Sequence, residues 1–156
     1  MFRTGQIRPA LLGLALGAFA AGAVAAPMTY NVDPRHTFPS FEADHSGGVS
    51  VWRGKFNSTS GTITLDKEAQ SGSVNITIDA ASIDFGLDAM NDHAKSADMF
   101  DVEQFPTATY TGRLTGWENG MPTAVEGELT LHGVTQPLDL EIRKFKCNAG
   151  RGGGET

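Results

Sequence analysis

The sequence predicts a mainly β protein, an antiparallel barrel or sandwich with one short helical excursion. Residues 73–79 and 107–115 alternate apolar and polar side chains, which is typical of strands with one buried face. Such segments are joined by Gly, Asn, Asp and Pro turns, and no βαβ rhythm is present. Only residues 82–109 show helical spacing instead. An antiparallel sheet with one buried face must close on itself or stack on another sheet.

The strands are expected to follow one another as hairpins. The expected extended segments are residues 28–32, 37–45, 61–66, 73–79, 107–115, 125–131 and 138–142. Residues 49–56 have no clean period and are ambiguous. Turn signals stand at Asp33-Pro34, at Gly47-Gly48 and at His132-Gly133.

The helical excursion is predicted near residues 88–100. Starting at Met90, apolar residues recur at i, i+4, i+7 and i+10, which places them on one face of a helix. Asp88 is the expected N-cap. The pair Phe105-Pro106 is expected to end the helix, because the residue before a proline is pushed out of the helical region. The apolar face is expected to cover one end or flank of a barrel with an apolar interior.

The first 25 residues have the organisation of a secretory signal peptide. Arg3 and Arg8 form a positive region, an apolar run follows, and residues 23–25 form an A-x-A cleavage site. A membrane anchor is the alternative, but the apolar run is short for a span. Export to the periplasm is therefore expected, with residues 1–25 as signal peptide, 27–146 as the barrel domain and 147–156 as an irregular Gly-rich tail.

The charge of the chain excludes some partners. The formal net charge is −6 at pH 7, and removal of Arg3 and Arg8 with the signal would make it more negative. An acidic chain without a basic cluster is a poor binder of nucleic acid. No later apolar run is long enough for a membrane span, so no integral segment is expected after cleavage.

The sequence contains no clear motif for a metal site or for a catalytic nucleophile. His36, His45, His93 and His132 are scattered without metal-ligand spacing, so no metal site and no other cofactor is expected. No Gly-x-Ser-x-Gly elbow is present, so the chain is not expected to be an enzyme. The alternatives left open are a small exported hydrolase or isomerase, and a stress-related structural protein with an incidental cavity.

Several segments resemble the YceI-like, polyisoprenoid-binding family of periplasmic lipocalin-like proteins. The segments that carry the resemblance are YNVDPRHTFPSFEADHSG at 30–47, VWRGKF at 51–56, SIDFGLDAMNDHAKSADMFDVEQFPTATY at 82–110 and VEGELTLHGVTQPLDL at 125–140. The resemblance implies an eight-stranded antiparallel barrel around an apolar tunnel that holds a polyisoprenoid lipid or an isoprenoid quinone. It also marks His93, which is interpreted as anchoring the helix to the barrel, with contact to the ligand as the alternative.

The resemblance also implies a shortened barrel. Family members continue past the strand near Phe145 with two further strands, whereas this sequence runs FKCNAGRGGGET, so the last two strands are expected to be missing. Cys147 would then lack a disulfide partner. An unpaired strand edge promotes pairing, so a homodimer is among the expected partners.

The expected function is a periplasmic carrier that sequesters an isoprenoid lipid. A filled core without a cavity is the alternative, but the small residues Ala43, Ala108, Gly112 and Gly127 are interpreted as leaving volume unfilled. The residues expected to bind the lipid are Phe41, Ala43, Ile63, Val74, Ile76, Ile78, Met90, Phe100, Tyr110, Leu114, Leu129, Leu131 and Leu138.

Overall fold

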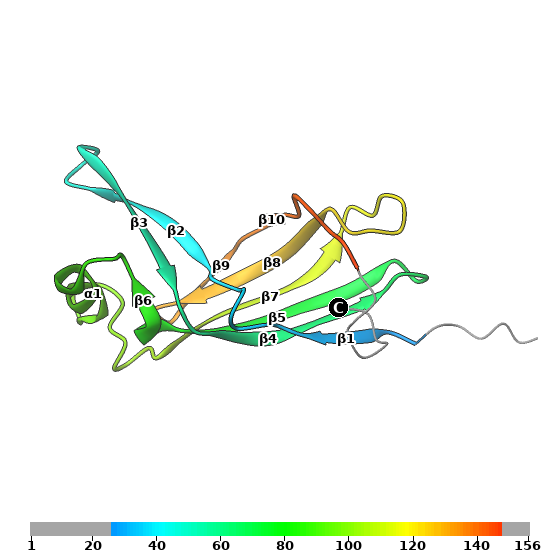
Figure 1. The fold of residues 1–156 in the computed structure, drawn as a ribbon, viewed down its shortest axis with the longest axis horizontal. Coiled ribbons are helices and arrows are strands. Elements are labelled where there is room, and N and C mark those ends of the chain that lie inside the picture. The colour runs from blue at the N-terminus through cyan, green and yellow to red at the C-terminus, as the bar shows by residue number, and fades with distance from the viewer. Residues whose placement is uncertain (1–25, 148–156) are drawn as a thin grey trace, which may run out of the picture.

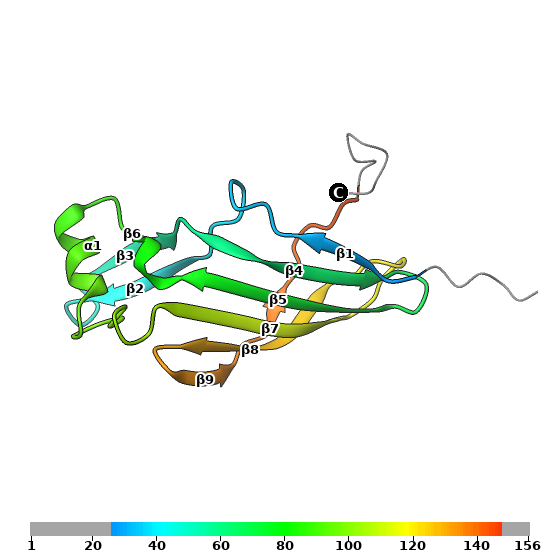
Figure 2. The ribbon, with the colours of Figure 1, turned by 90° about the horizontal axis from the view of Figure 1, so that it is seen from below.

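The computed structural model describes residues 26–147. The predicted signal peptide, residues 1–25, lies outside the described residues, as does the Gly-rich tail beyond Cys147. Figures 1 and 2 show a long twisted sheet with a smaller sheet and one helix at one end.

The larger sheet is antiparallel throughout and contains the longest strands. Its strands are β1 (Met28–Asn31), β4 (Thr59–Asp66), β5 (Ser71–Asp79), β7 (Thr107–Thr115), β8 (Ala124–Leu131), β9 (Val134–Pro137) and β10 (Leu140–Glu141). Their order is β1-β4-β5-β7-β8, after which β9 and β10 pair with different parts of β8. The prediction of a mainly antiparallel β protein is thus confirmed.

The smaller sheet contributes Phe41 and Phe56 to one end of the site. It consists of β2 (Ser40–His45), β3 (Ser50–Phe56) and β6 (Ile83–Asp84), in that order and antiparallel. In Figure 1 the β2–β3 hairpin diverges from the larger sheet, so that the two sheets enclose an angle. Within residues 26–147 the strands do not close into a barrel, because β1 and β2 each pair on one side only.

The alternating pattern places the apolar residues of β5, β7 and β8 on the enclosed face, where two clusters form. One lies where the two sheets meet, and its buried members are Phe56, Ile78, Ile83, Ala94 and Ala108. The other lies further along the larger sheet, and its buried members are Leu65, Val74, Tyr110, Leu114 and Val125. The half-buried Ile76 packs against both clusters, so the core is continuous along β5.

The helix is shorter than the sequence suggests. A turn of 3₁₀ helix, η1 (Ala80–Ser82), precedes β6, and α1 spans Asp88–Lys95. Leu87 occupies the N-cap position without a side-chain hydrogen bond, so the prediction of Asp88 as the cap is wrong. The helix ends because Ser96 adopts an extended backbone and its Oγ donates to the His93 carbonyl oxygen at 2.7 Å, well before the predicted stop at Phe105-Pro106.

Side chains other than His93 attach the helix to the sheet. His93 is exposed, whereas Ala94 is fully buried in the first cluster. The Asn91 side chain accepts a hydrogen bond from the Phe85 amide at 2.7 Å and donates to the Asp84 carboxylate at 3.4 Å. The interpretation of His93 as the anchor is therefore wrong, because the residues that contact the sheet lie on other faces of the helix.

The last part of the described chain also differs from the prediction. His132 and Gly133 both have positive φ, 52° and 72°, which is the backbone of a tight hairpin turn. The chain therefore returns immediately as β9, and only Leu140–Glu141 of the expected strand 138–142 is paired, as β10.

Candidate functional site

An apolar groove lies between the two sheets, with a volume of about 660 Å³. This volume falls within the roughly 300–1,000 Å³ typical of small-molecule sites. The groove is lined by His36, Thr37, Phe38, Pro39, Ser40, Phe41, Phe56, Ile76, Ile78, Phe100, Ala108, Tyr110, Leu129, Leu131, Leu138 and Leu140. Most of these side chains are hydrocarbon, so the groove suits an apolar ligand.

The floor of the groove is built by strand register. Ile76 of β5 lies opposite Tyr110 of β7, which in turn lies opposite Leu129 of β8. Residues that face each other across an antiparallel pair point to the same side of the sheet, so these three side chains form one row. Ile78 and Ala108 form the next row and are 6% and 2% exposed.

One wall of the groove is the segment of residues 138–140, which hydrogen bonds hold against β8. The Tyr110 hydroxyl donates to the Leu138 carbonyl oxygen at 2.9 Å, and the Leu138 amide donates to the Gly127 carbonyl oxygen at 2.8 Å. A Cβ at Gly127 would lie 2.5 Å from the Tyr110 hydroxyl oxygen, so only glycine leaves room for this phenol. The wall thus depends on a tyrosine and a glycine from neighbouring strands.

The opposite wall is the connection between β1 and β2. The Pro39 carbonyl oxygen accepts a hydrogen bond from the Phe56 amide at 2.9 Å, which fixes this connection against β3. Phe38 is 43% exposed, and the ammonium of Lys55 lies 5.3 Å from the centre of its ring. Across the groove Leu138 and Leu140 are 41% and 42% exposed, so both rims are apolar and open to solvent.

Aromatic rings close the end of the groove nearest the helix. The ring of Phe41 lies 5.7 Å from Phe56, 5.6 Å from Phe85 and 6.0 Å from Phe100, measured between ring centres. These separations are typical of favourable ring pairs. Phe100 follows the helix, so the aromatic cluster joins the helical excursion to the two sheets.

The structure brings together part of the predicted set of binding residues. The predicted residues that line the groove are Phe41, Ile76, Ile78, Phe100, Tyr110, Leu129, Leu131 and Leu138. Ile63, Val74 and Leu114 lie on the same face of the sheet but pack in the second cluster. Ala43 lies opposite Trp52 in the β2–β3 hairpin and Met90 lies on α1, both outside the lining.

The interpretation that small residues leave free volume is wrong at Gly112 and Gly127. A Cβ at Gly112 would lie 2.7 Å from Cγ1 of Val125, and the space at Gly127 is filled by Tyr110. Neighbouring side chains and backbone therefore occupy the glycine positions. The groove volume comes from the angle between the sheets.

Sequence reasoning missed the wall formed by residues 36–40. Phe38 and Pro39 do not belong to any alternating strand, so no periodicity marks them. Phe56 was also not predicted to line the site, because residues 49–56 show no clean alternation of apolar and polar side chains. The expected strand 37–45 is wrong over residues 37–39, because β2 begins only at Ser40 and the preceding residues form the wall.

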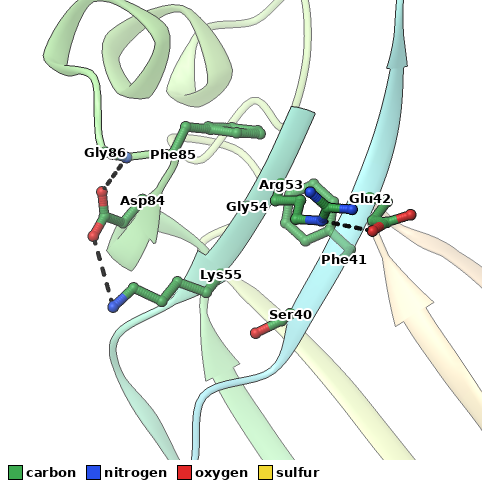
Figure 3. Close-up of a pocket in the computed structure, with 9 residues that line it drawn as sticks. All are labelled: Ser40, Phe41, Glu42, Arg53, Gly54, Lys55, Asp84, Phe85 and Gly86. Atoms are coloured by element: carbon green, nitrogen blue, oxygen red, sulfur yellow. Dashed lines mark hydrogen bonds and ion pairs between the residues drawn. The ribbon is translucent and has the colours of Figure 1, made fainter. Parts of the chain in front are cut away.

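A second hollow, of about 740 Å³, lies on the smaller sheet, and four charged side chains are among its lining residues (Figure 3). Ser40, Lys55 and Asp84 lie opposite one another on one face of β2, β3 and β6. The Arg53 guanidinium lies 2.7 Å from Glu42 and the Lys55 ammonium lies 4.0 Å from Asp84, so each cation has a carboxylate partner. These exposed pairs offer no unpaired charge, and we take the apolar groove as the candidate site.

The pKa shifts of Tyr110 and Asp84 follow from burial and from their hydrogen-bond partners. Burial, and then the nearby Asp139 carboxylate, raises the pKa of Tyr110, so its phenol stays neutral. The Gly86 amide, followed by the Asn57 side chain, lowers the pKa of Asp84. Among residues 26–147 no group of three His, Cys, Asp or Glu side chains is arranged to hold a metal ion. No helix in this part of the chain is long and apolar enough to cross a membrane.

Comparison with known proteins identifies relatives of similar sequence. Protein YceI of Escherichia coli O6:H1 is 35% identical over 141 residues, which cover 88% of this chain and 73% of that protein. A UPF0312 protein of Yersinia pestis (strain Pestoides F) is 37% identical over 142 residues, with the same shares covered.

Solved structures show the same fold. The YCEI protein of Campylobacter jejuni is 26% identical, with a TM-score of 0.56 and coverage of 81% of this chain and 74% of that chain. BcnA of Burkholderia cenocepacia has a TM-score of 0.58, covers 72% of this chain and 69% of its own, and at 23% identity indicates the fold alone. The family model described as YceI-like domain matches residues 30–156. The chain therefore belongs to the YceI-like domain family.

Proposed function

We propose that this protein binds the hydrocarbon chain of an isoprenoid lipid, such as a polyprenol or an isoprenoid quinone, in the apolar groove. The observation that carries the proposal is the groove of about 660 Å³ whose floor, formed by Ile76, Ile78 and Leu129, is hydrocarbon. The one polar atom of the Tyr110 side chain is already bonded to Leu138, so the floor presents no unsatisfied hydroxyl to the ligand.

Burial of hydrocarbon supplies the affinity. Each buried CH₂ contributes about 0.8 kcal/mol, so several isoprene units offset the loss of ligand freedom without a specific polar contact. The exposed rims at Phe38 and Leu140 let a long chain enter from the side and extend beyond the groove. The isoprenoid identity of the chain is our proposal from the resemblance of the sequence to polyisoprenoid-binding proteins.

The protein acts by binding and not by chemistry. Of the polar side chains on the wall, Ser40 and His36 are engaged elsewhere. The Ser40 hydroxyl donates to the Phe38 carbonyl oxygen at 2.9 Å, and Nδ1 of His36 lies 2.8 Å from the Asp33 carboxylate. No serine–histidine hydrogen bond therefore forms on the groove wall.

The compartment is the periplasm. The charged and apolar organisation of residues 1–25 supports export, and the acidic net charge suits a freely diffusing carrier that anionic membrane surfaces do not retain. A carrier in this compartment would move an isoprenoid lipid between membrane sites by shielding its chain from water.

Extraction of lipid from the purified full chain tests the proposal. The protein is expressed with its N-terminal segment in a bacterium, recovered from the periplasm and examined by native mass spectrometry, followed by lipid extraction. We expect about one isoprenoid lipid per chain, as for a site of this size. A preparation that carries only trace phospholipid, and that does not bind added farnesol, would contradict the proposal.

A pair of matched variants locates the ligand. Leu129→Asp places a carboxylate on the groove floor, and a lipid chain lying there would remove water from this charge without giving it a partner, which is unfavourable. Val51→Asp makes the same change on β3, where Val51 is 57% exposed and outside the groove. We expect the first variant to lose the lipid and the second to retain it. Equal retention by both would place the lipid elsewhere.

A further inference from the structure

His36 stands at the rim of the groove with one ring nitrogen already engaged. It lines the groove, and its side chain is 78% exposed. Nδ1 of the ring lies 2.8 Å from an oxygen of the Asp33 carboxylate. The other nitrogen, Nε2, is therefore the ring atom left for a ligand.

The Asp33 carboxylate sets the tautomer of the ring. Hydrogen bonds from the His36 side chain, the Arg35 amide and the Arg35 guanidinium lower the pKa of Asp33 well below its ordinary value, so the carboxylate is ionised at neutral pH. An ionised carboxylate can only accept hydrogen bonds, so the proton between the two side chains lies on Nδ1. In the neutral ring Nε2 then carries a lone pair and accepts.

The turn that holds this pair is rigid by sequence. The Asp33 side chain accepts a hydrogen bond from the Arg35 amide at 2.9 Å, and the His36 amide donates to the Asp33 carbonyl oxygen at 3.1 Å. Pro34 restricts the backbone between them. The imidazole is thus positioned by its own turn and does not depend on a ligand.

The remaining polar side chains of this wall are those of Thr37 and Ser40, whose hydroxyls can donate as well as accept. The Ser40 hydroxyl proton is used on the Phe38 carbonyl oxygen. The opposite rim consists of the leucine side chains of residues 138 and 140. A lipid whose chain lies on the floor therefore meets one imidazole acceptor where its head leaves the groove.

We propose that His36, oriented by Asp33, is the residue that selects the head of the bound lipid, and that it favours a hydroxyl over a head that can only accept hydrogen bonds. A prenol or a phenolic quinol donates its O–H to Nε2, whereas an ether or a carbonyl faces the Nε2 lone pair with its own lone pairs. This inference rests on the proposed function, because it assigns a head to the chain that the groove holds.

The test compares farnesol with farnesyl methyl ether at pH 8 on the full chain. The two probes share the same farnesyl chain, and in the ether a methyl group replaces the hydroxyl hydrogen, which removes the donor. One net hydrogen bond corresponds to a few-fold to about tenfold difference in Kd, so we expect wild type to bind farnesol about 3- to 10-fold more tightly than the ether.

Two variants test whether the preference for farnesol over the ether comes from His36 and Asp33. His36→Phe retains a planar ring but removes Nε2, and we expect it to bind both probes equally. Asp33→Asn keeps a side-chain acceptor for the Arg35 amide but can also donate to Nδ1, so it should reduce the preference without abolishing binding. Far-ultraviolet circular dichroism checks that both variants are folded.

The outcomes separate the two proposals. Equal binding of the probes by wild type, or a preference that survives in His36→Phe, overturns the role of His36 and leaves the groove function standing. Binding of neither probe by wild type overturns the groove function, and the head preference with it.

Discussion

Replacement of Phe41 by alanine tests the link between the aromatic cluster and the groove. Phe41 contributes to both, because its ring contacts Phe56, Phe85 and Phe100 and also lines the groove. A fully buried Phe→Ala change costs about 3–5 kcal/mol, and each ring pair contributes about 0.5–1.5 kcal/mol beyond burial. Since Phe41 is only half-buried, we expect the free energy of unfolding to fall by about 2–3 kcal/mol.

The assay is urea unfolding followed by circular dichroism. With a slope of about 1–3 kcal/mol per molar urea, the midpoint should fall by about 0.7–3 M. A typical domain is stable by about 5–15 kcal/mol, so the variant should remain folded in buffer and its lipid binding can be measured.

The binding loss follows from the hydrocarbon contact that is removed. If the Phe41 ring covers on the order of 50 Å² of the ligand chain, its loss removes about 1.3 kcal/mol, or roughly tenfold in the Kd for farnesol. Phe105→Ala is the matched control, because Phe105 is also half-buried and its ring packs against the His132 ring, with the ring centres 4.4 Å apart, outside the groove. The control should lose stability but keep its affinity. If Phe41→Ala binds farnesol as wild type does, or both variants weaken binding equally, the assignment of Phe41 to the ligand wall is wrong.

Further substitutions test the hydrogen bonds and close contacts around the site. Tyr110→Phe removes the bond to the Leu138 carbonyl and should lower the free energy of unfolding by about 1 kcal/mol in urea titrations; an unchanged value would mean that water replaces the phenol. The pKa of Tyr110 is raised in the fold, so the neutral phenol contributes its full share of the free energy of unfolding below pH 10, and this share is lost as the pH rises through the raised pKa. The free energy of unfolding of wild type should therefore fall more steeply above pH 10 than that of Tyr110→Phe. Parallel curves for the two proteins would refute this. Asn91→Ala leaves the Phe85 amide without its partner and should cost about 1–3 kcal/mol, with faster amide hydrogen exchange in the helix; full protection there would show that Asn91 is not the anchor. Gly54→Ala would place a Cβ 2.8 Å from the Phe85 ring and should lower the melting temperature through a cost of about 1–3 kcal/mol, whereas a neutral effect would show that the ring moves freely.

Much of the larger sheet could be predicted because its signal is local. The alternation in residues 73–79 and 107–115 indicates which side chains share a face, and the structure confirms both strands. Alternation indicates the face of the sheet to which a side chain points, but it does not indicate which cluster along the strand the side chain joins. Val74 and Ile76 have the same parity, yet Ile76 lines the groove and Val74 packs in the second cluster.

The rest of the site depends on contacts between distant segments. Phe38 and Pro39 become a groove wall only because the β1–β2 connection is bonded to Phe56 of β3. Gly127 looks like free volume in the sequence, but the Tyr110 phenol from the neighbouring strand occupies its space. The angle between the sheets, which creates the groove, has no signature in any single segment.

The helix shows a competition between local signals. The apolar spacing from Met90 continues to Phe100, and the proline at position 106 suggested the end of the helix. Ser96 ends it earlier, because its hydroxyl bonds to the preceding turn, and the chain then turns so that the Phe100 amide donates to the Ala94 carbonyl oxygen at 3.0 Å. The apolar spacing persists because Phe100 still packs against the cluster that contains Ala94.

Photo-crosslinking with a prenol that carries a diazirine near the end of its chain tests the central claim most directly. Labelled peptides of the full chain are identified by mass spectrometry, with unlabelled farnesol as competitor. The account predicts competed labelling within β5 and β8, at Ile76 or Leu129 on the groove floor. Competed labelling at Val49 or Met28, which are exposed apolar side chains outside the groove, with none on the floor, would contradict it.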